Sequence, residues 1–220
     1  MRAAVGGSGR SSRARWAIAL VAAALAAIWL AMMVGGTGPL DRQVYEALYA
    51  GGHPALIELA KAGSLLGDPR LLVPAALAAA MWLWWKGHPH TALTMLAVPL
   101  VGRGVNSLMK VDVQRLRPTI EPHLVVEQSN SFPSGHAAGS MIFFLTLALL
   151  LTHRGPWRRW AASAAVGVAM LVGTTRIMLG VHWPSDVVGG WAFGVLWVLL
   201  TLRMAQDLIA RRPDIRHGAE

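Results

Sequence analysis

The chain has 220 residues, of which 55% are hydrophobic and 14% are charged, and its formal net charge at pH 7 is +9. Ordinary soluble domains carry about 25% charged residues, so this shortage, with a mean hydropathy of +0.47, indicates an integral membrane protein. The lack of cysteine excludes disulfides, thiolate metal sites and cysteine nucleophiles. The excess of basic over acidic residues does not indicate a nucleic-acid partner, because most arginines stand between apolar runs, where they set membrane orientation.

The first apolar run, residues 16–34, contains no charged residue and follows several arginines. Its length approaches the ~20 residues that a helix needs to cross a bilayer. A cleaved signal peptide has a similar composition, but this run is longer than the usual apolar core and ends in a poor cleavage site. We therefore expect a retained transmembrane helix, preceded by a disordered basic segment at residues 1–15.

The next segment, residues 35–70, is less apolar. Its part from about residue 54 to 66 carries leucines and an isoleucine beside Glu58 and Lys61. A helix with both apolar and charged residues can lie in the plane of the membrane interface. We therefore expect an interfacial helix here rather than a spanning one.

Five further apolar runs follow, at about residues 71–85, 91–109, 137–152, 160–175 and 187–202. Several are shorter than a full span, but each can be extended by a turn into its flanks. Pro74 makes the first of these five runs the weakest candidate for a spanning helix, although proline is tolerated in membrane helices. The sequence thus predicts an all-α fold, an integral membrane bundle of six transmembrane helices in a domain of residues 16–205, followed by a cytoplasmic tail at 206–220.

Three separated segments contain charged and catalytic residue types within this apolar sequence. They are Lys110 followed by Arg117-Pro118, then Pro133-Ser134-Gly135-His136, then Arg176 followed by His182 and Asp186. Charged groups are costly next to hydrocarbon, so such a set needs a functional reason. Three cations, two imidazoles and one carboxylate suit the binding of a multiply charged anion and nucleophilic and acid–base chemistry on it.

The order and internal spacing of these residues resemble the three-part signature of the type 2 phosphatidic acid phosphatase (PAP2) family. They read Lys110-x6-Arg117-Pro118, Pro-Ser-Gly-His at 133–136, and Arg176-x5-His182-x3-Asp186. The resemblance covers about residues 50–205, and it implies a PAP2/haloperoxidase-like helical core in a membrane lipid phosphate phosphatase. Thr175 departs from the serine that is usual there, but it keeps the hydroxyl group.

Several of these residues suit the binding of a phosphoryl group, which carries charge on its non-bridging oxygens. Lys110, Arg117 and Arg176 can neutralise that charge, the arginines as bidentate donors. Ser134 and Gly135 stand just before an expected helix, where free backbone N–H groups and the helix dipole favour an anion. The resemblance implies the same five binding residues.

The remaining three residues of the three segments suit the catalytic steps. His182 is the expected nucleophile, giving a phosphohistidine intermediate. Asp186 is four residues later, on the same face if a helix begins at Pro184, and can accept the other ring N–H and fix the tautomer. His136 can protonate the leaving group and then activate water. The resemblance implies the same roles, and only one of these residues is acidic, so we expect neither a metal nor a cofactor.

Orientation follows from the distribution of the cations. With six spans, both termini lie on one side together with twelve of the 20 Lys and Arg residues. Of the other eight, three are the binding cations above. By the positive-inside rule we expect cytoplasmic termini and an extracytoplasmic active site. The Ala-, Arg- and Gly-rich composition and the small size are typical of a bacterial protein, so we expect the inner membrane of a bacterium.

Other interpretations remain open at this point. A transporter or flippase for anionic lipids could use the same cations without needing the paired imidazoles. A catalytically inactive scaffold and a haloperoxidase fit less well. Arg103 lies two turns before Lys110 on the same face, where it either pairs with an anion or ties helices together, and we favour the second role. The expected partners are membrane lipids and a lipid phosphate substrate of the phosphatidate, phosphatidylglycerophosphate or undecaprenyl pyrophosphate type.

Overall fold

The computed structural model describes residues 8–152 and 155–210, with side chains described for residues 16–152 and 155–205. All of the regular structure in these residues is helical. The eight helices are α1 (Ser8–Gly35), α2 (Pro39–Leu48), α3 (Pro54–Leu65), α4 (Pro69–Trp85), α5 (Pro89–Val113), α6 (Gly135–Leu151), α7 (Pro156–Met178) and α8 (Pro184–Ala210).

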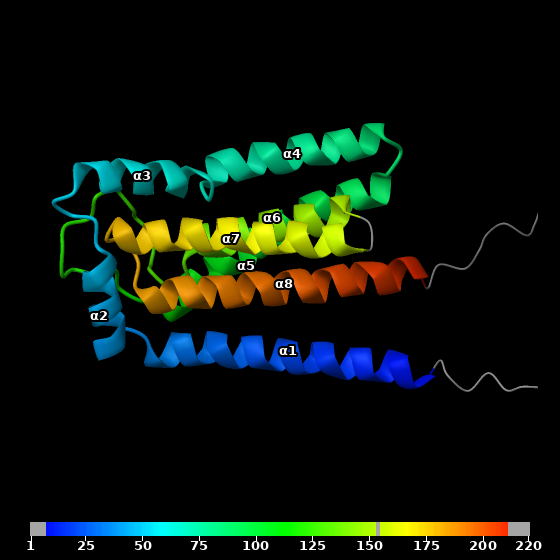
Figure 1. Ribbon diagram of the computed structural model, residues 1–220, viewed down its shortest axis with the longest axis horizontal. Helices are drawn as coiled ribbons and strands as arrows, with labels where there is room; N and C mark the ends of the chain where they lie inside the picture. The colour runs from blue at the N-terminus through cyan, green and yellow to red at the C-terminus, as the bar shows by residue number, and fades with distance from the viewer. Residues whose placement is uncertain (1–7, 153–154, 211–220) are drawn as a thin grey trace, which may run out of the picture.

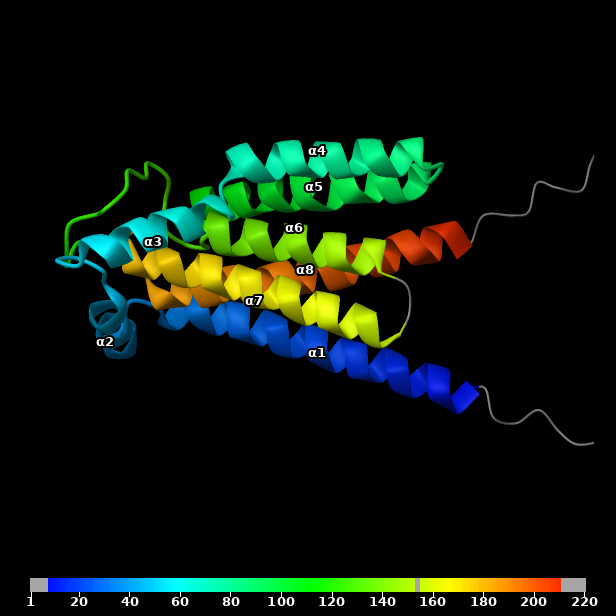
Figure 2. The same cartoon turned by 45° about the horizontal axis from the view of Figure 1, so that its top comes forward.

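Six of these helices, α1, α4, α5, α6, α7 and α8, run side by side along the long axis of the molecule (Figure 1). Helix α2 lies across one end of the bundle, and the view in Figure 2 looks nearly along its axis. Helix α1 begins and helix α8 ends at the opposite end. The six expected apolar runs correspond to these six long helices, which confirms the predicted fold class.

Five helical segments in the described chain are long and apolar enough to cross a membrane. They are Trp16–Gly35, Pro54–Trp85, Pro89–Val113, Pro156–Met178 and Pro184–Ala205, of which the second joins α3 and α4. The sixth apolar helix is α6, which has 17 residues and packs against α4, α5, α7 and α8. Helix α6 is therefore central in the bundle, and the Pro-Ser-Gly-His segment stands at its start.

Proline marks the start of most of these helices. It is the first helical residue of α2, α3, α4, α5, α7 and α8. Proline is favoured there because its fixed φ suits a helix and the first N–H groups of a helix have no partner inside it. Pro74 lies within α4 and Pro99 within α5, and both helices continue through them.

The segment at residues 35–70 forms two helices rather than one. Helix α3 covers the expected interfacial segment, but it packs along α7 roughly in line with α4, and α2 is the helix that lies crosswise. Helix α2 is attached to the start of α8, because Asp41 accepts hydrogen bonds from the backbone N–H and the hydroxyl of Ser185. The interfacial position of residues 54–66 stays a prediction.

The ends of the long helices extend beyond the expected domain limits. Helix α1 begins at Ser8 instead of residue 16, and α8 continues to Ala210 instead of ending at 205. Adding a residue to an existing helix costs little, and the Arg and Ala in these flanks are good helix formers. The rest of the expected disordered segment and of the tail, residues 1–7 and 211–220, lies outside the described residues.

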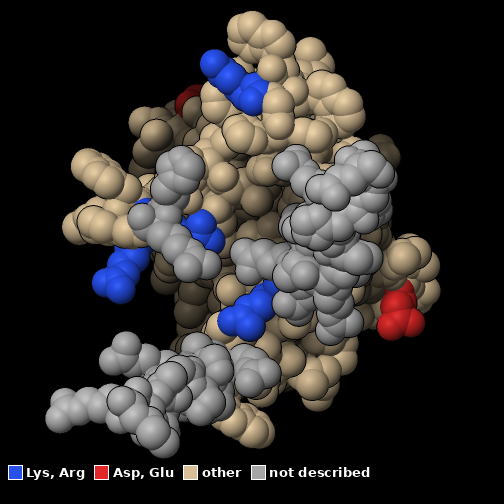
Figure 3. All heavy atoms as spheres, turned by 90° about the vertical axis from the view of Figure 1, so that its right-hand side faces the viewer, with Lys and Arg blue, Asp and Glu red and all other residues tan. Residues whose placement is uncertain are grey.

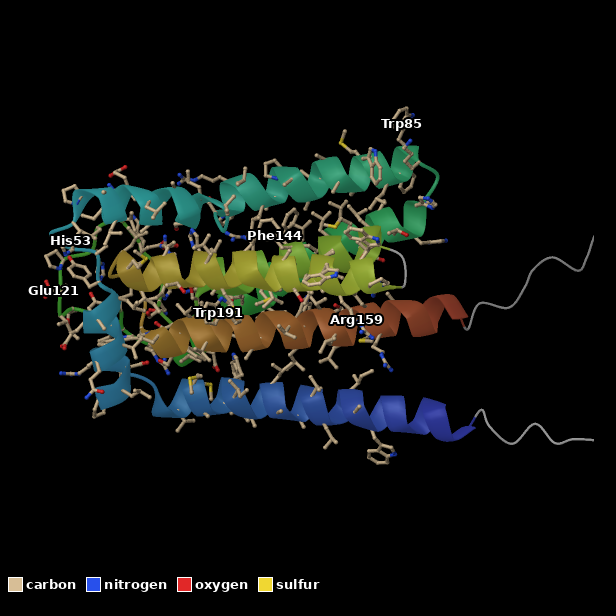
Figure 4. All side chains as sticks on the ribbon, in the orientation of Figure 1. His53, Trp85, Glu121, Phe144, Arg159 and Trp191 are labelled. Atoms are coloured by element: carbon tan, nitrogen blue, oxygen red, sulfur yellow. The ribbon has the colours of Figure 1, made fainter. Side chains whose placement is uncertain are left out.

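The end of the bundle that is remote from α2 carries exposed tryptophan. Trp16, Trp85, Trp157 and Trp160 expose 70% to 81% of their surface there. Figure 3 views this end and shows Lys and Arg side chains scattered over a largely uncharged surface. Figure 4 shows Trp85 and Arg159 towards this end, and His53 and Glu121 at the other. Tryptophan and cations in one layer are typical of a membrane interface.

Candidate active site

The His182–Asp186 pair forms at the turn between α7 and α8. Because α8 begins at Pro184, Asp186 lies in its first turn and accepts a hydrogen bond from the Trp183 backbone N–H at 2.9 Å. The same oxygen, Oδ2, lies 3.3 Å from Nδ1 of His182. A carboxylate at Nδ1 keeps the proton on that nitrogen and leaves a lone pair on Nε2. The expected i, i+4 pairing is therefore present in the structure.

Two residues that the sequence analysis did not single out hold this carboxylate in place. Arg115 donates to Oδ1 of Asp186 at 2.9 Å, and the hydroxyl of Ser131 donates to Oδ2. The Ser131 hydroxyl is also 3.3 Å from Nδ1 of His182. Asp186 has no exposed surface, so these donors satisfy a carboxylate that is fully buried.

Arg117 lies on the other side of the His182 ring. Its Nη1 is 3.3 Å from Nε2 of His182, and its Nε donates to the backbone carbonyl of Ser129 at 2.8 Å. Burial lowers the pKa of Arg117 from its usual value, but an arginine remains charged. Burial and the nearby Arg117 cation lower the pKa of His182 well below its usual 6.5. The imidazole is therefore neutral near pH 7, with its Nε2 lone pair beside the cation.

Lys110 and the Pro-Ser-Gly-His segment complete the wall of the site. Lys110, near the end of α5, donates to the backbone carbonyls of Asn130 and Ser131. Gly135 is close to it, since a Cβ added at Gly135 would lie 3.8 Å from Cε of Lys110. His136 follows in the first turn of α6. The start of α6 and the side chain of Lys110 are therefore close together.

One cavity of about 490 Å³ joins these groups. The expected site residues that line it are Lys110, Arg117, Gly135, His136 and His182. Its remaining wall includes apolar side chains from α4, α5 and α6, among them Leu72, Leu100 and Phe143. The cavity therefore presents a cationic, imidazole-bearing region next to a surface that suits a hydrocarbon chain.

Two of the expected phosphate-binding residues lie elsewhere. Ser134 is fully buried, and its hydroxyl caps α6 by accepting from the Ala137 backbone N–H. Arg176 donates to the hydroxyl of Ser64 and forms an ion pair with Glu127. Arg176 lines a second cavity of about 190 Å³, which shares His136 and Glu127 with the first. Glu127 also pairs with Arg117 at 3.4 Å, so its carboxylate stands between the two arginines.

Close packing of α8 against α6 brings the second and third segments together. The Ser134 backbone N–H donates to the carbonyl of Asp186 at 3.0 Å. A Cβ added at Gly190 would lie 2.8 Å from the carbonyl oxygen of Ser134, which is closer than real Cβ atoms approach. Glycine at 190 therefore permits the contact that sets the start of α6 beside the His182–Asp186 pair.

The comparisons with known proteins agree with this geometry. The PAP2 superfamily is matched by residues 91–210, more than half of the chain. This chain belongs to the PAP2 superfamily. A relative named phosphatidylglycerophosphatase B, from Bacillus subtilis (strain 168), is 30% identical over 73% of this chain and 80% of its own length. The family resemblance in the three sequence segments is thereby confirmed.

Other PAP2 relatives have related names. A putative undecaprenyl-diphosphatase of Escherichia coli (strain K12) is 32% identical over 59% of this chain and 65% of its own length. The crystal structure of a transmembrane PAP2 phosphatidylglycerolphosphate phosphatase from Bacillus subtilis matches with a TM-score of 0.77 and 26% identity. That match covers 87% of this chain and 98% of the crystallised one. The fold is thus that of a transmembrane PAP2 phosphatase, and the chain is an integral membrane protein.

Among the residues that sequence reasoning missed, Arg115 had a usable signal. Residues 115–117 are not helical, and Leu116 is 81% exposed between two partly buried arginines, so Arg115 and Arg117 point to the same side. Arg115 therefore accompanies Arg117 into the PAP2 site. Ser131 and Glu127 gave no such signal, because their partners lie 55 and 49 positions away.

Proposed function

We propose that this PAP2 protein hydrolyses a lipid phosphate or pyrophosphate through a phosphohistidine intermediate, at the extracytoplasmic face and without a metal ion. The observation that carries the proposal is the shared cavity, in which His136, His182, Lys110 and Arg117 adjoin an apolar wall. The polar part suits a phosphoryl group, and the apolar wall suits the lipid chain.

In the first step, Nε2 of His182 attacks phosphorus and the bond between phosphorus and the leaving oxygen breaks. Asp186 accepts the Nδ1–H of His182 and stabilises the positive charge that develops on the ring. Lys110 and Arg117 neutralise the negative charge on the equatorial oxygens of the transferring phosphoryl group. Metal ions neutralise this charge in other phosphoryl-transfer enzymes. His136, on the same cavity, donates its proton to the leaving oxygen.

In the second step, water attacks the phosphohistidine. His136 is now neutral and takes a proton from that water, while the bond between Nε2 of His182 and phosphorus breaks. The products are inorganic phosphate and a free His182, for a monoester substrate. Arg176 joins the phosphate-binding set when the phosphoryl group takes the place of the Glu127 carboxylate between the two arginines.

The relatives support a lipid as the substrate. Their names refer to phosphatidylglycerophosphate, to undecaprenyl diphosphate and to lipid A. For this chain we propose phosphatidate, phosphatidylglycerophosphate or undecaprenyl pyrophosphate as the substrate type. The cation distribution in the sequence supports cytoplasmic termini in a bacterial inner membrane, which puts the end with α2 and the site outside.

Phosphate release by the purified protein in detergent tests the proposal. The substrates are phosphatidate, phosphatidylglycerophosphate and an isoprenyl diphosphate, each in the presence of EDTA. We expect release in chelator that is abolished by His182→Ala and by His136→Ala and retained by Arg42→Gln, which changes an exposed residue of α2 outside the cavity. A strict need for a divalent ion would contradict the mechanism.

The transporter hypothesis predicts a different result in the same variants. A protein that only binds and moves anionic lipids would keep its lipid movement in proteoliposomes when His182 is replaced by Ala. Phosphate release would then be absent from the wild type as well. The catalytic proposal requires release by the wild type and its loss in the variant.

A further inference from the structure

Helix α5 carries two polar residues that the proposed chemistry does not use. Arg103 and Asn106 line the same cavity as Lys110, and the three residues are spaced i, i+3 and i+7. That spacing puts them on one face of the helix. They extend the polar part of the cavity from Lys110 along α5, between the apolar walls.

Asn106 is buried without a partner for its carbonyl oxygen. Its side chain is 5% exposed, and Oδ1 accepts no hydrogen bond from any described residue. A Cβ added at Gly135 would lie 3.7 Å from Nδ2 of Asn106, so the amide is next to the start of α6. Buried polar atoms are nearly always paired, and an unpaired acceptor beside a ligand cavity indicates a ligand that donates to it.

Arg103 is the second unpaired group. It takes part in none of the ion pairs between described residues, and its guanidinium donates no hydrogen bond to any of them. The expected role of Arg103 in tying helices together therefore has no partner in the described part of the chain. A cation on a membrane helix that lines a cavity with an apolar wall needs an anion, and the cavity is where one can enter.

We propose that Arg103 and Asn106 form a second subsite that binds a phosphoglycerol linker between the reacting phosphate and the lipid chains. Arg103 binds the phosphodiester anion, and Oδ1 of Asn106 accepts a hydrogen bond from the glycerol hydroxyl. This inference rests on the proposed function and adds the substrate class to it. The preferred substrate is then of the phosphatidylglycerophosphate type.

The spacing along α5 favours this linker over a diphosphate. Seven residues separate Lys110 from Arg103, which is about 10 Å of helix at 1.5 Å per residue, and Asn106 lies between them. The two phosphorus atoms of a diphosphate share one bridging oxygen, so both stay beside Lys110 and Arg117. A glycerol linker separates its two phosphorus atoms by several bonds and places a hydroxyl between them.

A substrate panel measured with Arg103→Gln tests the first contact. Loss of a charge-assisted hydrogen bond lowers kcat/KM for phosphatidylglycerophosphate by about 10- to 100-fold. Phosphatidate and an isoprenyl diphosphate lack the linker phosphodiester, so their kcat/KM changes by less than about threefold. The control Arg42→Gln removes the same charge from an exposed position near the same end of the bundle and leaves all three values unchanged.

A cycle with Asn106→Ala tests the second contact. The wild type is compared on phosphatidylglycerophosphate and on an analogue whose linker lacks the glycerol hydroxyl. We expect the wild type to lose about 3- to 10-fold in kcat/KM on the analogue and the variant to lose nothing further, because the hydrogen bond is already gone. Unchanged phosphatidate hydrolysis by Asn106→Ala shows that the variant is folded.

Several results would overturn the subsite. Equal losses on all three substrates in Arg103→Gln would make Arg103 a general electrostatic or structural residue, and no loss on any would mean that it does not touch the substrate. A selective loss on the diphosphate would contradict the linker assignment. Failure of the proposed function is distinct from these, because the wild type would then release no phosphate from any substrate.

Discussion

Arg115 donates a hydrogen bond from Nη1 to Oδ1 of Asp186 at 2.9 Å, although the two residues are 71 positions apart. The Nη2 group of the same arginine donates to the carbonyls of Met32 and Met33, near the end of α1, at 2.8 and 2.6 Å. The first transmembrane helix is therefore connected through Arg115 to the carboxylate that orients the His182 ring.

Replacing Arg115 by Ala should reduce both stability and activity. Asp186 has no exposed surface and would lose its only ion pair with a described arginine or lysine. Removing one partner of a buried pair costs about 3–5 kcal/mol, because the other charge is left buried and unpaired. We expect a lower free energy of unfolding in detergent and a lower kcat, with Arg115→Lys intermediate. Equal stability of Arg115→Ala and the exposed control Arg42→Ala would contradict this account.

Ser131→Ala tests the second support of the carboxylate. The Ser131 hydroxyl donates to Asp186 and is 3.3 Å from Nδ1 of His182. Loss of a hydrogen bond to a charged group lowers kcat by about 10-fold or more, because the ring is held less firmly for attack. Ser131 does not line the cavity, so KM for the lipid should change little. A change in KM with kcat intact would show that Ser131 contacts the substrate instead.

Much of the site could be predicted from the sequence, because the three segments have fixed local spacings. The His182–Asp186 contact follows from the i, i+4 spacing and from the helix start at Pro184. The close approach of α8 to α6 agrees with the glycine at 190. These are short-range features, which a single chain displays directly.

The rest depends on contacts that no local pattern contains. Helices α2 and α3 begin at Pro39 and Pro54, which could have marked them, but nothing in the sequence indicates that α2 lies crosswise. Glu127 stands in a loop and meets Arg176 only because that loop folds back over the bundle end. Ser134 caps its helix, a role that competes with phosphate binding at the same position.

Glu127→Gln should strengthen the binding of inorganic phosphate. In the structure the Glu127 carboxylate pairs with Arg117 at 3.4 Å and with Arg176, so an incoming phosphate competes with it. The Glu127 side chain is 22% exposed, which limits the effect, and we expect the inhibition constant of phosphate to fall by about 3- to 10-fold. The matched control is Glu58→Gln, which breaks an exposed pair with Lys61. A higher inhibition constant would mean that Glu127 holds the arginines in place for phosphate.

The pH dependence of kcat/KM should reflect the low pKa of His182. Burial first, and then the Arg117 cation, lower that pKa well below 6.5, so the His182 ring stays neutral as the pH falls through 6.5. We expect the acidic limb for the free enzyme to lie below pH 6.5, after correction for the ionisation of the substrate. An acidic limb of the wild type above pH 6.5 after that correction would contradict this expectation.

The lowered pKa of His182 also affects the stability of the folded protein. The unfolded chain takes up a proton at His182 near pH 6.5, whereas the folded chain does so only at lower pH. The unfolded state therefore binds more protons below pH 6.5, and the contribution of this histidine to the free energy of unfolding falls as the pH decreases. Thermal unfolding in detergent between pH 7.5 and 5, compared with His182→Ala, measures this contribution.

The most direct test of the central claim is rapid quenching of the enzyme with a substrate that carries a labelled terminal phosphate, followed by peptide mapping at alkaline pH. The account predicts that the wild type carries the label on His182 as an acid-labile phosphohistidine, and that His182→Ala carries none. Full turnover by the wild type with the label on another residue would contradict the assignment of His182 as the nucleophile.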